Sequence, residues 1–298
     1  MKRLFLILGL AMLVVSCGGE KTQTSSTTTE APKRHGWDGY GFALYGDVAQ
    51  VVETYWQAAD KFGEVVKDKL DYREVWIFDE RGNAVSRTNY DSNGKLANKG
   101  IYKYDNEGRC VDYSKYRSDG KLRLKTIFRY DDKGNCIEEA WYDADGRLSR
   151  KTVRKFNDNG KCIEVAEYDA DGCLQEKSLY SYNSEGECVE MKCCNSDGKV
   201  ERKATYIYND KGQITEETGV PSHGGRYKST RTYDANGRLV ESVYESNYHD
   251  GDIGNFEKLV CCRYKQDSHD NMVEIRQYSY RGELIVPETI SEYEITYR

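Results

Sequence analysis

One period of the chain contains four segments: Cys136-Ile-Glu-Glu-Ala-Trp-Tyr142, Asp143-Ala-Asp-Gly146, Arg147-Leu-Ser-Arg-Lys-Thr-Val-Arg-Lys-Phe156 and Asn157-Asp-Asn-Gly160. Two β-prone segments alternate with two Asp/Asn-x-x-Gly segments. In these, the Asp or Asn side chain caps a turn and the Gly supplies the positive φ that ends it. The segments between turns are too short for stable isolated helices. The period therefore predicts a β-hairpin.

The turn glycines recur every 26 residues. One series is Gly82, Gly108, Gly134, Gly160, Gly186 and Gly212, and the other is Gly94, Gly120, Gly146, Gly172 and Gly198. Fixed self-similarity of this kind indicates an array of one small unit. We predict an all-β fold: a repetitive antiparallel β-hairpin array with a 26-residue period, forming an extended, twisted, solenoid-like meander.

Charged residues suggest a register for this array. Folding a hairpin about its four-residue turn places Glu138 opposite Lys151. The same operation pairs Asp112 with Lys125, Glu164 with Lys177 and Glu190 with Lys203. Opposite charges that meet in successive hairpins are expected to hold the register, because a slip of one residue turns a whole strand face over.

Both ends of the array are less regular. Residues 48–66 fit a first strand, Val48–Ala58, followed by a turn at Lys61-Phe-Gly63, although Val48, Val51, Val52 and Tyr55 also have helical spacing. Longer connections at 219–225 and 247–255 precede expected strands at Phe256–Tyr264, Met272–Tyr280 and Ile290–Tyr297, the last of which closes the array.

Composition limits the function. The net charge is −6, and 32% of the residues are charged with both signs interspersed, so we expect no nucleic-acid partner. Hydrophobic residues make up 38%, which favours a thin core renewed at each repeat over one thick core.

The N-terminus has the pattern of an export signal. Lys2 and Arg3 precede the apolar run Leu4–Val15, which is too short for a mature membrane-spanning helix. We therefore predict a signal peptide at 1–16. A flexible Ser/Thr-rich tether at 17–40 leads to the repeat domain at 41–298.

Residues Val14-Val-Ser-Cys17 resemble the lipobox of bacterial lipoproteins. The resemblance implies cleavage before Cys17 and acylation of that residue, which would give a membrane partner through a lipid anchor. It implies a bacterial cell-envelope protein anchored at the outer membrane, on either the periplasmic or the surface face. A plain signal peptide with an incidental cysteine is the alternative.

A second resemblance rests on Tyr-x-Tyr-Asp/Asn-x-x-Gly. The motif occurs at Tyr102–Gly108, Tyr180–Gly186 and Tyr206–Gly212, and it resembles the YD repeat of RHS-type proteins over about Ala43 to Tyr280. Large RHS shells enclose a toxic C-terminal domain, whereas this chain ends in a strand-like segment. It is more similar to small bacterial lipoproteins with YD-like repeats.

Four of the ten cysteines lie in one column and are expected to carry free, buried thiols. Cys110, Cys136, Cys162 and Cys188 share one column. In a meander, residues one period apart lie two strands apart, about 9.6 Å, which is beyond the ~7 Å limit for a disulfide. A solenoid with one coil per period would instead allow bridging.

No enzyme, metal or cofactor site is evident. Asp143-Ala-Asp145-Gly146 and Asp169-Ala-Asp171-Gly172 resemble half of a calcium loop, but the twelfth position is Thr152 or Ser178, so we interpret both as turns. The adjacent cysteines 193–194 and 261–262 point to opposite faces of a strand and would hold zinc poorly. A hydrolase using His223 and His249 in the irregular loops is a weaker alternative.

Aromatic side chains are the candidate binding residues. Tyr and Trp on a sheet can stack on sugars or on a partner's apolar strip. The candidates are Trp56, Trp76, Tyr102, Trp141, Tyr180 and Tyr206. We therefore expect a non-catalytic envelope scaffold for protein or glycan binding. Two alternatives are structural aromatics that face a core, and a purely structural envelope element.

Intact-mass measurement of the mature protein tests the lipid anchor. We expect a mass that corresponds to a chain starting at Cys17 with acyl groups attached. Cys17→Ala should lose that mass and leave the membrane fraction, whereas Cys110→Ala should stay membrane-bound. A membrane-bound Cys17→Ala chain would contradict the anchor.

Overall fold

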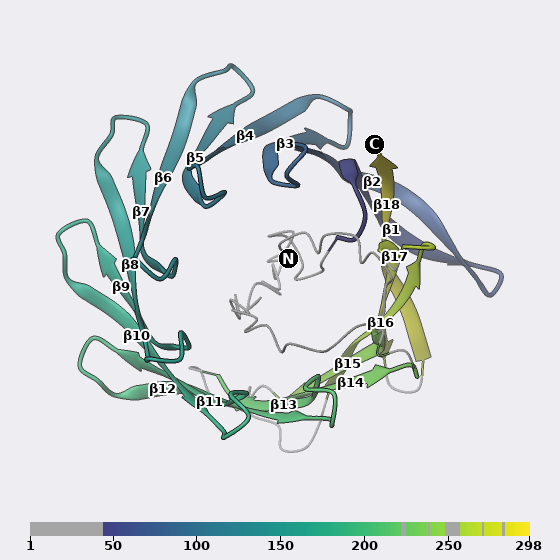
Figure 1. Cartoon of the computed structure of the whole chain (residues 1–298). Coiled ribbons are helices and arrows are strands. Elements are labelled where there is room, and N and C mark those ends of the chain that lie inside the picture. Colours follow the sequence, from purple (N-terminus) through teal and green to yellow (C-terminus); the bar gives the residue numbers. More distant parts are fainter. Residues whose placement is uncertain are drawn as a thin grey trace, which may run out of the picture.

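A computed structural model describes residues 44–221, 225–235, 237, 239–247, 257–269, 271–281 and 284–298. Within these ranges, eighteen strands form one antiparallel sheet. Each strand pairs with its neighbours in sequence, and β1 also pairs with β18, so the sheet closes into a ring (Figure 1). No helix in the described residues is long and apolar enough to cross a membrane. The predicted all-β hairpin array is confirmed.

The strands follow the predicted punctuation. Their bounds are β1 (Val48–Lys61), β2 (Glu64–Phe78), β3 (Ala84–Asp91), β4 (Leu96–Tyr104), β5 (Cys110–Arg117), β6 (Leu122–Tyr130), β7 (Cys136–Asp143), β8 (Leu148–Phe156), β9 (Cys162–Asp169), β10 (Leu174–Tyr182), β11 (Cys188–Asn195), β12 (Val200–Tyr208), β13 (Ile214–Val220), β14 (Arg226–Tyr233), β15 (Leu239–Asn247), β16 (Glu257–Gln266), β17 (Met272–Arg281) and β18 (Leu284–Tyr297). We call the end where β1 begins and β18 ends the terminal rim, and the opposite end the far rim.

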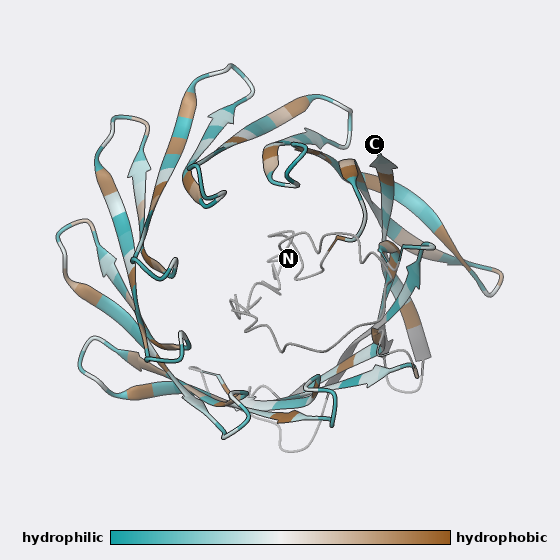
Figure 2. Cartoon of the chain, in the orientation of Figure 1, coloured by the Kyte–Doolittle hydropathy of each residue, from teal (hydrophilic) through white to brown (hydrophobic). Residues whose placement is uncertain are grey.

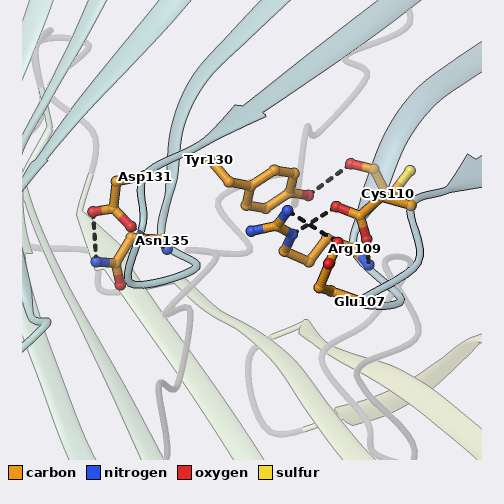
Figure 3. A network of polar contacts seen from close by, with 7 residues as sticks. Glu107, Arg109, Cys110, Tyr130, Asp131 and Asn135 are labelled. Atoms are coloured by element: carbon orange, nitrogen blue, oxygen red, sulfur yellow. Dashed lines mark hydrogen bonds and ion pairs between the residues drawn. The ribbon is translucent and has the colours of Figure 1, made fainter.

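The Asp131–Gly134 turn between β6 and β7 shows why the motif is Asp/Asn-x-x-Gly. The Gly134 N–H donates to the Asp131 carbonyl at 3.0 Å, and Gly134 has φ 85°, which glycine adopts without steric cost. Asp131 Oδ1 accepts the N–H groups of Lys133 and Asn135 at 3.0 and 2.8 Å. Asn135 Nδ2 also donates to Asp131 Oδ2 at 2.8 Å (Figure 3). The carboxylate thus holds the whole turn.

A tyrosine ladder joins the repeats near the terminal rim. The Tyr130 hydroxyl donates to the Cys110 carbonyl at 2.7 Å, a contact drawn in Figure 3. The equivalent bonds start from Tyr104, Tyr182, Tyr208 and Tyr233 and end on Ala84, Cys162, Cys188 and Ile214, at 2.6–2.8 Å. In β4, β6, β10, β12 and β14, the final Tyr therefore ties the end of the strand to the start of the preceding strand.

The two faces of the wall can be assigned to the lumen and the outside. The segment leading into β1 runs on the inner side of the ring in Figure 1. Its Leu44 belongs to one buried cluster with Val51, Trp76 and Tyr293. Because directly paired residues share a face and side chains alternate along a strand, this assignment extends around the sheet. We call the face with Trp76 the lumenal face and the other the outer face.

The predicted charge register is wrong by two residues. Lys151 pairs directly with Ala140, and Glu138 pairs with Val153. One residue of the shift arises because Tyr142 pairs with Leu148 and not with Arg147, and the second arises from a bulge between the Tyr142–Leu148 and Trp141–Arg150 pairs. Glu138 and Lys151 still share the outer face, and their charged atoms lie 3.7 Å apart on the diagonal. Asp112 and Lys125 (2.9 Å), and Glu190 and Lys203, meet similarly. For Glu164 the recorded partner is Lys155, at 2.9 Å.

The ends of the array pair with each other. Residues 48–61 are a strand, which confirms the strand interpretation over the helical one, and the expected turn lies at Phe62–Gly63. The last strand, β18, is longer than predicted and pairs with β1 through Glu53 and Tyr293. Closure removes the free edges that an extended meander would have left exposed.

The column cysteines carry free thiols, as predicted for a meander. Cys110, Cys136 and Cys162 are half-buried and Cys188 is buried. In the described chain, Cys173, Cys193 and Cys194 are also unbridged. Cys193 pairs with lumenal Arg202, whereas its neighbour Cys194 lies on the outer face. The side chains of Cys193 and Cys194 therefore point to opposite faces of the sheet, as expected for neighbours on a strand.

The ladder hydroxyl is missing where Phe78 and Phe156 occupy the tyrosine position, and Phe156 lies between two repeats that have it. Phe156→Tyr is expected to add a hydrogen bond to the Cys136 carbonyl and to raise the free energy of unfolding by about 0.5–1.5 kcal/mol. Tyr130→Phe is expected to lower it by a similar amount. Urea unfolding of both variants measures these effects. A ladder without energetic importance would leave both midpoints at the wild-type value.

Candidate functional site

The lumenal face carries a row of aromatic rings at equivalent positions of successive repeats. The even-numbered strands contribute Trp76, Tyr102, Phe128, Tyr180 and Tyr206, with Arg154 at the same position of β8. Tyr113 of β5 joins them because it pairs directly with Tyr102. We call Trp76, Tyr102, Tyr113, Phe128, Tyr180 and Tyr206 the lumenal girdle.

Five of the six aromatic residues predicted from the sequence lie on this face. Trp76, Tyr102, Tyr180 and Tyr206 belong to the girdle, and Trp141 lies one row nearer the far rim. Trp56 lies on the outer face instead, opposite Ile290, with the Lys67 ammonium 5.4 Å from its ring centroid. The structure therefore gathers five candidates and separates the sixth from them.

The five lumenal aromatic candidates differ in how much of their surface is exposed. Trp76 and Tyr206 keep only 1% and 6% of their surface exposed, so they pack within the wall. Tyr102, Trp141 and Tyr180 are half-buried and keep ring surface open. Burial also raises the pKa of Tyr180 and Tyr206, so both hydroxyls stay neutral hydrogen-bond donors at ordinary pH. The rings available for a ligand are thus Tyr102, Trp141 and Tyr180.

Tyr113 is a girdle member that the sequence analysis missed. Its ring lies against Gly100 of β4, where a Cβ atom would come within 2.6 Å of the tyrosine ring. The Tyr102 and Tyr113 ring centroids are 4.7 Å apart, and those of Trp76 and Tyr102 are 6.1 Å apart. The equivalent positions of the other repeats carry a side chain, whereas Gly100 has none. A glycine within a strand can mark a place where an aromatic ring from a neighbouring strand covers the backbone, so Gly100 is the signal that could have predicted the Tyr113 ring.

Arginine accompanies the aromatic rings on the lumenal face. The Arg150 guanidinium lies 4.1 Å from the Trp141 ring centroid, and Arg154 forms an ion pair with Glu139 at 2.8 Å. Arg87, Arg202 and Arg231 also lie on this face, paired with Glu74, Glu176 and Glu217. Arginine stacks on rings and binds planar polar groups, which lysine does poorly.

The outer face carries ion pairs of both lysine and arginine. Lys125–Asp112, Lys155–Glu164 and Lys265–Glu274 each lie at 2.9 Å. Arg129–Glu138 and Arg276–Glu274 lie at 3.1 and 2.6 Å. Figure 2 shows polar and apolar segments interspersed along the strands of the wall.

Three of the described thiols and one calcium-like motif were the candidates for chemistry or metal binding. Burial raises the pKa values of Cys136, Cys188 and Cys193, the last to about 11, so these thiols are protonated at neutral pH and react poorly. Asp143 Oδ1 accepts the N–H groups of Asp145 and Arg147 at 2.9 Å, which supports the turn interpretation of the calcium-like motif. No group of three metal-ligating side chains occurs among the described residues.

The loop histidines proposed for a hydrolase, His223 and His249, lie outside the described residues, as does Cys17. His269 is described: its N–H donates to Asp267 Oδ1 at 2.8 Å, and its ring lies 4.4 Å from that of Tyr297. This histidine packs the turn between β16 and β17.

A buried carboxyl group lies at the seam where the ring closes. Glu53 of β1 is 1% exposed and directly faces Glu74 of β2 and Tyr293 of β18. The hydroxyls of Tyr72 and Tyr293 lie 3.4 and 3.3 Å from Glu53 Oε1. The nearest cation, Arg87, is bound to Glu74 at 2.9 Å. Burial raises the pKa of Glu53 to about 7, against the opposing effects of the two hydroxyls and Arg87.

Comparisons with known proteins show the fold only distantly. A family described as "Uncharacterised protein" matches residues 67–191, less than half of the chain. A comparison with curated proteins finds no match. A porin-like protein from Bacteroides uniformis is 11% identical with a TM-score of 0.44, over 84% of this chain and 98% of that one. A porin-like protein from Bacteroides vulgatus is 12% identical with a TM-score of 0.29, over 84% and 98%.

Toxin structures show a looser likeness. The Photorhabdus luminescens Tc holotoxin pore is 13% identical with a TM-score of 0.27, over 85% of this chain and 20% of that one. The TcdB2-TccC3-Cdc42 structure is 12% identical with a TM-score of 0.29, over 83% and 19%. At these scores the likeness carries no argument about family or function.

The Glu53 seam makes stability depend on pH. Folding raises the pKa of Glu53 from 4.5 to about 7, so the folded chain binds more protons than the unfolded chain between those values. The free energy of unfolding is therefore expected to fall as pH rises from about 4.5 to 7, by on the order of 2–3 kcal/mol. Glu53→Gln should flatten this dependence in urea titrations. Glu167→Gln, an exposed lumenal control, should leave it intact, and identical pH profiles for all three chains would contradict the assignment.

Proposed function

We propose that this chain is a non-catalytic, lipid-anchored barrel of the bacterial cell envelope that binds a ligand on its lumenal face. The observation that carries the proposal is the gathering of aromatic rings and arginines on the lumenal face. Half-buried Tyr102, Trp141 and Tyr180 share this face with Arg150 and Arg154.

The chemistry of the lumenal face favours a glycan over a protein strip. Sugar rings present apolar faces that stack on aromatic side chains, and hydroxyl edges that accept or donate hydrogen bonds. Tyr102 and Tyr180 supply stacking surfaces, and pairs such as Arg154–Glu139 supply donors and acceptors between them. The lumenal face thus carries both kinds of group that a sugar chain requires.

The charged residues of the outer face favour a barrel whose outer wall contacts water. Charged pairs such as Lys125–Asp112 and Lys155–Glu164 lie within the strands. A lipid-facing charge at mid-membrane costs about 2–4 kcal/mol, so a wall with many of them is unfavourable in a bilayer. We therefore propose that the acylated Cys17 and its tether, rather than the strands, hold the protein at the outer membrane.

Glycan-array binding of the full chain, made unlipidated by Cys17→Ala, tests the proposal. We expect selective binding that Tyr102→Ala and Tyr180→Ala each weaken about tenfold, which corresponds to loss of one stacking contact near the upper end of its ~0.5–1.5 kcal/mol range. The matched controls are Tyr116→Ala and Tyr142→Ala, half-buried tyrosines on the outer face. A blank array, or equal losses in all four variants, would favour a purely structural envelope element.

A further inference from the structure

Strand β5 carries two cations in a row on the lumenal face. Lys115 pairs directly with Gly100 of β4, and Arg117 pairs with Asn98, so both share the face of Tyr113. At the two equivalent positions, the other odd-numbered repeat strands carry neutral or acidic residues. These are Asn89 and Asp91 in β3, Trp141 and Asp143 in β7, Glu167 and Asp169 in β9, and Cys193 and Asn195 in β11. The cationic row is therefore specific to β5.

Lys115 is half-buried and has no acidic partner. Within the part of the chain that the structure describes, its ammonium group forms no hydrogen bond or ion pair. The charged groups that act on it are Arg87 and Arg123, and together with burial they lower the pKa of Lys115. Arg87 already pairs with Glu74 at 2.9 Å. A cation that loses water costs free energy unless an anion compensates it, so Lys115 requires a counter-ion that these side chains do not supply.

Arg123 of β6 brings a third cation to the same place. It is the additional residue of a bulge that lies opposite Lys115 and its neighbour on β5, and it is exposed. The equivalent residues of the other repeats are Ala97, Ser149, Gln175 and Glu201. Among the described residues, neither Arg117 nor Arg123 has a carboxylate partner, whereas lumenal Arg154 is paired with Glu139 at 2.8 Å. Three cations thus meet here without an anion.

The turn after β5 gives up its capping side chain to place one of these cations. In both 26-residue series, the residue three positions before the turn glycine is Asp or Asn, except that Arg117 precedes Gly120. In the equivalent turn after β11, Asn195 Oδ1 accepts two backbone N–H groups at 3.1 and 2.9 Å. In the turn after β5, Asp119 at the third position accepts one backbone N–H group instead, at 3.0 Å. A residue that breaks the local turn rule without a gain to the fold indicates a functional role.

We propose that Lys115, Arg117 and Arg123 bind the negatively charged groups of an acidic glycan, a sugar chain that carries carboxylates or sulfates. This inference rests on the function proposed above and names the class of its ligand. Guanidinium groups bind oxyanions through paired N–H donors, and an ammonium group adds a charged contact. The Tyr102 ring keeps exposed surface, and its centroid lies 4.7 Å from that of Tyr113 on β5. A sugar stacked on Tyr102 thereby brings its charged substituent towards the cations.

Titration of the full unlipidated chain with three polysaccharides tests the inference. Polygalacturonate carries carboxylates, dextran sulfate carries sulfates, and dextran is neutral. We expect an acidic polymer to bind about tenfold more tightly than dextran, and the tighter of the two identifies the charged group. Lys115→Gln and Arg117→Asn should each weaken that binding about tenfold. The matched control is Lys99→Gln, an exposed lysine on the outer face of β4 whose loss should change the affinity less than about twofold.

Arg117→Asn also separates binding from folding. It restores the turn acceptor that Asn195 provides after β11, so the melting temperature should stay at or above the wild-type value while binding falls. Equal binding of dextran and both acidic polymers, an unchanged affinity in either lumenal variant, or an equal loss in Lys99→Gln overturns the inference. Failure of the inference alone leaves selective binding of neutral glycans that depends on Tyr102. Failure of the function proposed above leaves no selective glycan binding.

Discussion

The Asp/Asn-x-x-Gly turn is the constraint on which the rest of this structure depends. In turns such as Asp131–Gly134 a carboxylate oxygen accepts two backbone N–H groups, and a glycine with positive φ returns the chain. The turns recur at fixed intervals, so strand length is fixed, and strand length determines which residues meet across the sheet. The tyrosine ladder and the two faces of the wall all follow from that register.

Closure is the second determinant, and it has an energetic consequence. Pairing of β1 with β18 satisfies the edge hydrogen bonds of an otherwise open sheet. The seam also places Glu53 directly opposite Glu74 with only tyrosine hydroxyls as its hydrogen-bond partners. A protonated Glu53 suits this environment better than a carboxylate does, so the junction of the ring is also its most pH-sensitive element.

The two parts of the proposed lumenal site differ in how they arise. The lumenal girdle is periodic, because each repeat contributes one equivalent position. This position is Tyr102 in β4 and Tyr180 in β10, whereas it is Arg154 in β8. The cationic row of Lys115 and Arg117 is specific to β5 and departs from the turn chemistry of the repeats. A ligand that spans several repeats suits the girdle, whereas a charged group of that ligand suits the cations.

Much of the architecture could be predicted from the sequence, because the turn residues and the two-residue alternation act locally. The strand bounds, the separation of the column cysteines and the common column of Tyr102, Tyr180 and Tyr206 follow from spacing alone. The predicted charge register was wrong because the turn pairs Tyr142 with Leu148 and a bulge on β8 adds a second residue of shift, so that Lys151 faces Ala140. A bulge leaves no clear trace in composition.

Contacts between distant strands decided the features that the spacing of residues along the sequence does not specify. Closure depends on β1 meeting β18, strands separated by nearly the whole chain, and only closure defines a lumen and an outside. It therefore also decided that Trp56 faces away from the other candidates, and that Trp76 and Tyr206 are buried while Tyr102 and Tyr180 keep exposed surface. The physical reason is that local residues set the direction of each strand, whereas curvature accumulated over eighteen strands sets which neighbours finally cover each ring.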